Sequence, residues 1–353
     1  MFKEILYILS MVMIITIILP SIRKDHWTFR IFDYPRVQKF SLIGVLLITW
    51  LIFFNDSRMW YDLAIMGTLM VTFFYLGYLI IPYTRLGRKM IQQSQLADGK
   101  AAINILVANV YQDNKHYSRL LKLIEKRNPD IVFLVETDRK WLEAVKSLRQ
   151  NYPYYVEVPM ENTYGLLFYS KLPLANKEVR YLIDDEIPSI IADVHFDGET
   201  IRMFGVHPTP PVPQENEFST DRDAEILMIG RMAKEYSGPS IVFGDLNDVA
   251  WSYTTKLFLK SSELLDPRVG RGTYSTFNAH YPLLRWPLDH FFVSSHFHLV
   301  DMKVEKQIGS DHFPISICLT LTQQQDSEKL KADADDEELI TEKIEAGIAN
   351  DPR

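Results

Sequence analysis

The second half of the chain contains six short polar strings, each at one end of an apolar run. Each run has the length and composition of a buried strand, and each string supplies a carboxylate, an amide or an imidazole. Such groups converging at strand ends are suited to hold a hard metal ion and a phosphate. The strings are Asn109 in LVAN, Glu136 in LVET, His207 in GVHP, Asp245 and Asn247 in GDLN, Asp289 in LDH, and Asp311 and His312 in SDH.

These residue types match the needs of phosphate-ester hydrolysis. Mg²⁺ keeps several waters and needs only one or two carboxylates, and Glu136 at a strand end suits that role. Asp245 suits the base that activates water. Asn247 lies two residues further on, on the same side of an extended segment, where its amide can donate to phosphate. Asp289 and His312 can pair, which orients the imidazole and favours its charged form.

The six strings, in this order, resemble the endonuclease/exonuclease/phosphatase superfamily, also called the deoxyribonuclease I-like fold. The resemblance covers about residues 101–320, and the membrane-anchored bacterial members are the most similar in overall plan. It implies an α/β (α+β) four-layer sandwich: two packed, mainly antiparallel sheets flanked by helices, with the site at the strand ends. It also implies a divalent cofactor, Mg²⁺ or Mn²⁺, and a water nucleophile.

The resemblance implies a role for each polar residue. Asn109, Glu136 and Asp311 would stand at the metal, with Glu136 as its main ligand. His207 and Asn247 would contact the phosphate, and Asp245 would position or deprotonate the attacking water. Asp289 would hold His312. Taken singly, Glu136 is also compatible with a helix cap, Asp289 with a turn, and His207 with a structural histidine.

Two features depart from parts of the family. The apurinic-endonuclease branch has tyrosine where His207 stands, so histidine aligns this chain with the deoxyribonuclease, sphingomyelinase and inositol-phosphatase branches. The family often carries a second polar residue soon after the first asparagine, whereas Val110, Tyr111 and Gln112 follow Asn109 here.

Residues 1–85 differ in composition from the rest and predict three transmembrane helices, at about 4–22, 38–55 and 62–82. No small-residue cleavage site follows the first apolar run, so it is interpreted as a retained anchor rather than a signal peptide. The first loop and its flanks carry Arg23, Lys24, Arg30, Arg36 and Lys39, whereas the second loop carries only Arg58. Basic loops favour the cytoplasmic side. We therefore expect a multi-pass protein of the inner (plasma) membrane, with the amino terminus outside and the catalytic domain in the cytoplasm.

The remaining segments complete the predicted organisation. Residues 86–100 are predicted as a polar linker, 101–320 as the catalytic domain and 321–353 as an acidic disordered tail, in which one frayed helix near Glu337–Ala346 is the most structure expected. Cys318 is the only cysteine, which excludes an intrachain disulfide and a thiolate metal site.

The sequence leaves the substrate open between a nucleic acid and a phospholipid or inositol phosphate. Residues 101–320 carry 23 Lys and Arg against 29 Asp and Glu, which weighs weakly against tight nonspecific binding to duplex nucleic acid. The lipid bilayer is an expected partner, and no obligate protein partner is inferred. A catalytically silent membrane scaffold is the alternative from another class, but all the principal family residues are present.

Overall fold

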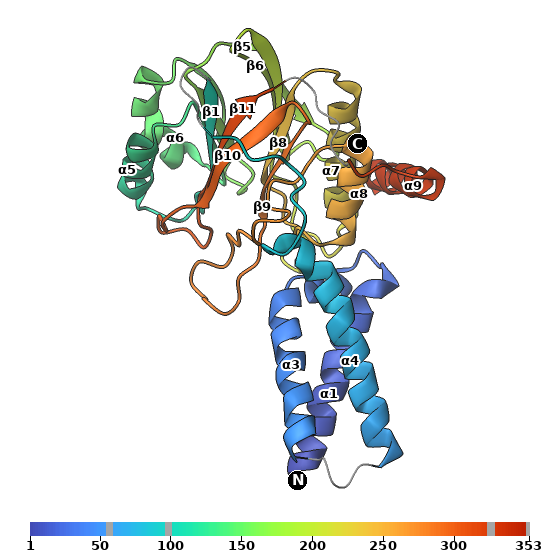
Figure 1. Ribbon diagram of the computed structural model, residues 1–353. Coiled ribbons are helices and arrows are strands. Elements are labelled where there is room, and N and C mark those ends of the chain that lie inside the picture. Colours follow the sequence, from blue (N-terminus) through green and yellow to red (C-terminus); the bar gives the residue numbers. More distant parts are fainter. Residues whose placement is uncertain (54–58, 96–100, 323–328, 351–353) are drawn as a thin grey trace.

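The computed structural model describes residues 1–53, 59–95, 101–322 and 329–350. Figure 1 shows a bundle of long helices projecting from one end of an α/β domain, with the amino terminus at the far end of the bundle. The chain enters the domain from this bundle, and the segments at the junction contact both parts.

The bundle consists of α1 (Phe2–Ile18), α3 (Arg36–Phe53) and α4 (Trp60–Ile80). All three are long and apolar enough to cross a membrane, in agreement with the prediction, although residues 54 and 55 of the second predicted span lie outside the described residues. Trp50 and Leu69 are buried between the helices, whereas Val71 and Phe74 are more than two-thirds exposed. Large apolar side chains directed outward are expected where lipid, rather than water, surrounds a helix.

Two sheets form the α/β domain. The first has strand order β10-β11-β1-β2-β4-β3, and the second has order β5-β6-β7-β8-β9. Only the pairs β1/β2 and β7/β8 are parallel, so both sheets are mainly antiparallel. The strands are β1 (Ala102–Asn109), β2 (Ile131–Val135), β3 (Tyr154–Val158), β4 (Leu166–Ser170), β5 (Leu174–Tyr181), β6 (Pro188–Phe196), β7 (Glu199–Val206), β8 (Ser240–Asp245), β9 (Asp289–Val293), β10 (Phe297–Val304) and β11 (Ile315–Leu321).

The sheets pack face to face around an apolar core in which Phe133, Phe168, Phe243 and Phe291 are fully buried. Helices α5 (Tyr117–Arg127) and α6 (Arg139–Val145) cover the outer face of the first sheet. Helices α7 (Thr220–Glu235) and α8 (Tyr253–Ser262) cover that of the second. The arrangement is helix, sheet, sheet, helix, so the predicted four-layer sandwich is confirmed (Figure 1).

The carboxyl-terminal segment differs from the predicted disordered tail. Helix α9 (Ala334–Asn350) packs against α7, with Ile340, Ile344 and Gly347 on its buried face. The acidic composition suggested a solvated tail, but these three residues recur at helical spacing and bury one side of the helix. Residues 323–328 and 351–353 of the predicted tail lie outside the described residues.

The predicted polar linker is also held to the domain where it is described. Ile91 belongs to the core between the sheets, and Gln93 forms an isolated bridge with Leu299 of β10. Arg271 donates to the Ile91 carbonyl at 2.7 Å. Residues 86–95 therefore pack on the domain, and residues 96–100 lie outside the described part.

Candidate active site

The parallel strand pairs bring the polar residues to one edge of the sandwich. Asn109 pairs with Val135, so Glu136 follows directly at the end of β2, and Val206 pairs with Gly244 in the second sheet. Parallel neighbours end at the same edge of a sheet. Asp289 begins β9 opposite Asp245, which places its carboxylate at that edge as well.

Asn109 connects the two sheets. Its Nδ2 donates to Glu136 Oε1 at 2.6 Å within the first sheet and to Asp245 Oδ2 at 3.0 Å across to the second. Its Oδ1 accepts from the Tyr111 backbone N–H. The amide nitrogen thus faces two carboxylates, each of which comes from a different sheet.

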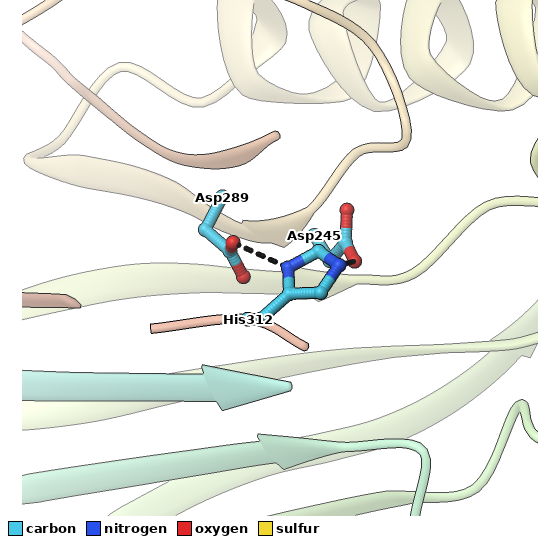
Figure 2. A group of neighbouring side chains, drawn as sticks. All are labelled: Asp245, Asp289 and His312. Carbon is cyan, nitrogen blue, oxygen red and sulfur yellow. Dashed lines mark hydrogen bonds and ion pairs between the residues drawn. The ribbon is translucent and has the colours of Figure 1, made fainter. Parts of the chain in front are cut away.

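Figure 2 shows His312 between two carboxylates. Its Nδ1 lies 2.8 Å from Asp289 Oδ2, and its Nε2 lies 3.5 Å from Asp245 Oδ2. Burial opposes the charged ring, but Asp245 and Asp289 outweigh it and raise the pKa of His312 to about 10. The imidazole is therefore cationic at neutral pH, as the pairing of Asp289 with His312 in the sequence suggested.

Glu136 and Asp245 are buried acids. Burial raises the pKa of Glu136 to about 7, against the opposing hydrogen bond from Asn109 and the charge of His312. Burial likewise raises the pKa of Asp245, which the positive charge of His312 partly offsets. A carboxylate with a raised pKa is a better proton acceptor than a solvated one.

Two residues at the strand ends have strained backbone. Glu136 has φ of 59° and Asn247 has φ of 51°, in the left-handed region that side chains other than glycine rarely occupy. Such strain persists only where neighbouring contacts hold it, and it concentrates at functional sites. Glu136 is held by Asn109, and Asn247 by a hydrogen bond from its own N–H to Asp245 Oδ1 at 3.0 Å.

His207 follows β7 and is 3% exposed. Burial lowers its pKa to about 4, so the ring is neutral at pH 7. Its Nδ1 has no hydrogen-bond partner within the described part of the chain, and Asp289 Oδ1 is likewise unpartnered there. A ligand bound here could supply the hydrogen-bond partners that these two buried atoms lack among the described residues.

Asn247 and Asp311 lie at the borders of the site. Asn247 Nδ2 donates to the Pro208 carbonyl at 2.9 Å, which leaves its second N–H available. The half-buried Asp311 carboxylate acts electrostatically on both Glu136 and His312. All eight residues singled out in the sequence are therefore at or beside one site.

Sequence reasoning missed the residues that support the loop after β8. The Asn247 carbonyl accepts from Tyr34 Oη at 2.8 Å and from Arg222 Nη1 at 2.7 Å. Asp248, the next residue, is buried and accepts from Ser252 and Thr255. A second carboxylate directly after GDLN was the available signal for Asp248, whereas Tyr34 gave none.

The donor set fits a hard divalent cation. Glu136, Asp245 and Asp311 offer carboxylate oxygens, the ligands that Mg²⁺ and Mn²⁺ prefer. Within the described residues, no lysine or arginine forms an ion pair with any of the three. Three carboxylates face one imidazolium here, and burial raises the pKa of Glu136, so a bound cation would offset the cost of its negative charge.

A four-layer α/β sandwich with an acidic, imidazole-containing edge defines a metal-dependent hydrolase of phosphate esters. The sequence matches the Endonuclease/Exonuclease/phosphatase family over residues 101–312, and the chain belongs to that family. The resemblance noted in the sequence is thereby confirmed. Members of this family use a divalent metal ion. A comparison with curated proteins found no match.

Three solved structures have the same fold. The endonuclease/exonuclease/phosphatase from Beutenbergia cavernae is 16% identical with a TM-score of 0.52, covering 67% of this chain and 76% of its own. That from Bacteroides vulgatus is 18% identical with a TM-score of 0.51, covering 63% and 100%. A family protein from Bacteroides thetaiotaomicron is 17% identical with a TM-score of 0.50, covering 63% and 99%. At this identity the likeness concerns the fold alone.

Proposed function

We propose that this protein is a membrane-anchored phosphodiesterase in which Glu136 and Asp311 hold the metal ion, Mg²⁺ or Mn²⁺. Asn109, expected from the sequence at the metal, orients the Glu136 carboxylate instead, because its amide nitrogen faces the site and its Oδ1 accepts from the Tyr111 N–H. The single observation that carries this proposal is the Asn109 amide, which joins Glu136 of one sheet to Asp245 of the other. When bound, the cation polarises a phosphoryl oxygen and favours attack by water. The site is built from both sheets, so it exists only in the folded sandwich.

Asp245 is the proposed base. It is buried, its pKa is raised, and its Oδ1 is fixed by the Asn247 N–H, so the carboxylate is oriented to receive a proton from the attacking water. The ligand atoms of Asp245, Asp289 and His312 lie within 4.8 Å of one another, a spacing that a metal would also produce. The imidazolium between the two carboxylates accounts for that spacing by ion pairing, so we assign the cation to Glu136 instead.

The remaining residues bind the phosphate. The cationic His312, held by Asp289, stabilises negative charge that develops on the phosphoryl oxygens. The neutral His207 ring and the second Asn247 N–H donate to the same oxygens. The open Nδ1 of His207 and Oδ1 of Asp289 are the atoms that such a ligand, with its bound water, would partner.

The surroundings of the site favour a phospholipid, which presents a single phosphodiester, over a nucleic acid. A cavity of about 440 Å³ beside Tyr164, whose ring packs on His207, is lined by acidic residues and by no lysine or arginine. Such a surface repels the repeated phosphates of a nucleic acid strand. Its carboxylates belong to Glu161, Asp184, Glu186, Glu215 and Asp221.

An apolar loop supports the same substrate class. Tyr281, Leu283 and Leu284 are 61%, 84% and 49% exposed, in the loop that precedes β9. Gln38, at the domain end of α3, donates to the Leu283 carbonyl at 3.0 Å, and the Ala279 N–H donates to the Asp311 carbonyl. Exposed apolar side chains between a proposed membrane helix and the site suit contact with a lipid surface.

A hydrolysis screen of the full chain in detergent tests the function. The panel contains sphingomyelin, phosphoinositides, a chromogenic diester, RNA, and single-stranded and duplex DNA, each with Mg²⁺, Mn²⁺ or EDTA. We expect metal-dependent turnover of a lipid or inositol phosphate, and none by Asp245→Asn. Cleavage of nucleic acids alone would overturn the substrate class, and no metal-dependent turnover of any ester would overturn the function.

A further inference from the structure

A second, separate cavity lies where the helical bundle meets the α/β domain. Its volume is about 230 Å³. Ile17 of α1 and Leu76 of α4 line it from the bundle, whereas Trp251, Ser252 and Tyr253 line it from the start of α8. The cavity therefore has an apolar side toward the bundle and a polar side toward the domain.

The polar side is strongly basic. Four of the lining residues are cations, Arg23, Arg36, Lys39 and Lys256, and the single anion is Asp33. Asp33 is already committed, because its Oδ1 accepts from Arg36 Nη2 at 2.5 Å. The net charge of the lining at neutral pH is thus positive by three, and a neutral occupant would leave that charge uncompensated.

Backbone carbonyls hold the two less exposed cations of this basic lining, and Arg36 also pairs with Asp33. Arg36 Nη1 donates to the Trp251 carbonyl at 2.8 Å. Lys39 is 5% exposed, and its Nζ donates to the carbonyls of Thr16 at 2.7 Å and Phe32 at 2.5 Å. An ammonium group has three donors, so one is left for a ligand.

The exposed part of the basic lining has cations for which the described chain offers no acidic partner. Neither Arg23 nor Lys256 forms an ion pair within the described residues, and both are exposed. The Arg23 guanidinium lies over the Tyr253 ring at 4.4 Å, which fixes it at the cavity edge. Two exposed cations without acidic partners in the described ranges therefore line this cavity.

We propose that this cavity binds the phosphate of an anionic phospholipid, whose acyl chains lie along α1 and α4. The inference rests on the proposed membrane placement of the three helices and is independent of hydrolysis. The volume is below the roughly 300–1,000 Å³ of sites for drug-sized ligands and suits a phosphate with its glycerol. Basic pockets between membrane helices at the cytoplasmic side hold such head groups. Ile18 and Tyr75, 54% and 45% exposed, offer apolar surface to the chains.

The lipid-binding cavity is separate from the active site, but it adjoins the loop that follows β8. Trp251 and Ser252 line the cavity, and Ser252 donates to Asp248, next to Asn247. A lipid in the cavity would stabilise the loop after β8, because Arg36 lines the cavity and also donates to the Trp251 carbonyl.

Binding to the full chain in detergent, with EDTA present to prevent turnover, tests the proposal. Native mass spectrometry would count bound lipid during titration with phosphatidylglycerol, phosphatidylcholine or inorganic phosphate. The test variant is Arg23→Ala/Lys256→Ala, and Lys256→Gln alone serves if the pair fails to fold. The matched control is Lys24→Ala/Lys140→Ala, which removes the same charge from residues outside the cavity.

We expect phosphatidylglycerol to bind in preference to phosphatidylcholine, with affinity about tenfold weaker in Arg23→Ala/Lys256→Ala and unchanged in the control. Equal phosphatidylglycerol binding by the test and control variants would overturn the site. If phosphatidylcholine bound as tightly as phosphatidylglycerol, the requirement for an anion would be overturned. If inorganic phosphate saturated the site at the same concentrations, the ligand would be free phosphate rather than a lipid. None of these outcomes depends on whether the enzyme hydrolyses a lipid.

Discussion

Asn109 is the residue on which both halves of the site depend, since its amide nitrogen contacts one carboxylate from each sheet. Around Asn109, the environment shifts the pKa values of two histidines in opposite directions. Burial alone dominates at His207 and lowers its pKa to about 4, whereas two carboxylates beside His312 raise its pKa to about 10. One imidazole is therefore neutral and the other cationic at the same pH.

Asp245→Asn should lower the rate of hydrolysis by roughly 10²–10⁴, because it removes the base while keeping the shape of the side chain. Circular dichroism should show an unchanged fold. The exposed Asp301→Asn in β10 is the control and should turn over normally. If Asp245→Asn keeps near wild-type turnover on a true substrate, Asp245 is not the base.

Glu136→Gln should raise the Mg²⁺ concentration needed for half-maximal activity, because it removes the charge that holds the cation. A role in packing alone would leave that concentration unchanged, since the two side chains have nearly the same volume. The measurement is a Mg²⁺ titration of activity beside Glu143→Gln, an exposed residue of α6. Identical midpoints in all three proteins would contradict metal binding by Glu136.

At the scale of elements, α8 and α9 both pack on α7. Helix α7 also buries two acids whose pKa values are shifted in opposite directions. Asp223 accepts from Arg222 and Lys343, and these cations outweigh burial and lower its pKa. Within the described ranges, the Glu225 carboxylate accepts a side-chain hydrogen bond from Ser189 Oγ alone, at 2.6 Å, and burial raises the pKa of Glu225 to about 7. The charged network ties α7 to α9, whereas Glu225 is held against β6 as a neutral acid.

The state of Glu225 predicts a pH dependence of stability. The unfolded chain releases this proton above about 4.5, but the folded chain holds it to about 7, so stability should fall across that interval and level off above it. Glu225→Gln should lack this pH dependence. At pH 8 its free energy of unfolding should exceed that of the native protein by up to about 3 kcal/mol. Thermal unfolding from pH 4 to 8 measures it, with the exposed Glu125→Gln as control. A constant difference between Glu225→Gln and the native protein at every pH would contradict it.

Helix α9 should contribute to folding rather than trail from the domain. Ile340 is fully buried against α7, so Ile340→Ala should cost about 2–4 kcal/mol and lower the melting temperature. Ile348, on the same helix, is 51% exposed, and Ile348→Ala should change little. Equal melting temperatures for the two variants would mean that the segment is detached in solution.

At the scale of the whole molecule, the bundle and the domain share an interface beside the active site. Trp251 Nε1 donates to the Asp33 carbonyl at 2.9 Å, and Tyr83 donates to the Ala250 carbonyl. Tyr34 reaches the Asn247 carbonyl from the loop between α1 and α3. These contacts support a placement of that loop on the same side of the membrane as the domain, since the contacting groups could not meet across a bilayer.

The topology prediction follows from this contact and from the charge of the loop. Five basic residues lie in or beside the first loop, so we expect residues 101–353 in the cytoplasm and Met1 outside. A reporter active only in the cytoplasm, fused after Arg353, should give signal, whereas one active only outside should not. Signal from the outside reporter alone would reverse the orientation and remove the case for an intracellular substrate.

The sequence by itself determined the strand ends, because most candidate residues end, follow or begin an apolar run whose pattern is local. Asn109, Glu136 and Asp245 could be selected in this way, and so could the three apolar helices. The family resemblance then supplied the order in which the strings belong together. Local patterns were sufficient here because strand burial and membrane length both act on consecutive residues.

Only the tertiary structure decided how these groups influence one another. The carboxylates that contribute most to the raised pKa of His312, Asp245 and Asp289, come from β8 and β9, and only the fold brings them to this ring while burial keeps His207 neutral. Tyr34 supports Asn247 across 213 residues, and α9 folds because α7 receives its apolar face. Burial, pKa and long-range hydrogen bonds depend on which elements pack together, and the packing of two sheets on each other leaves no local signal in the chain.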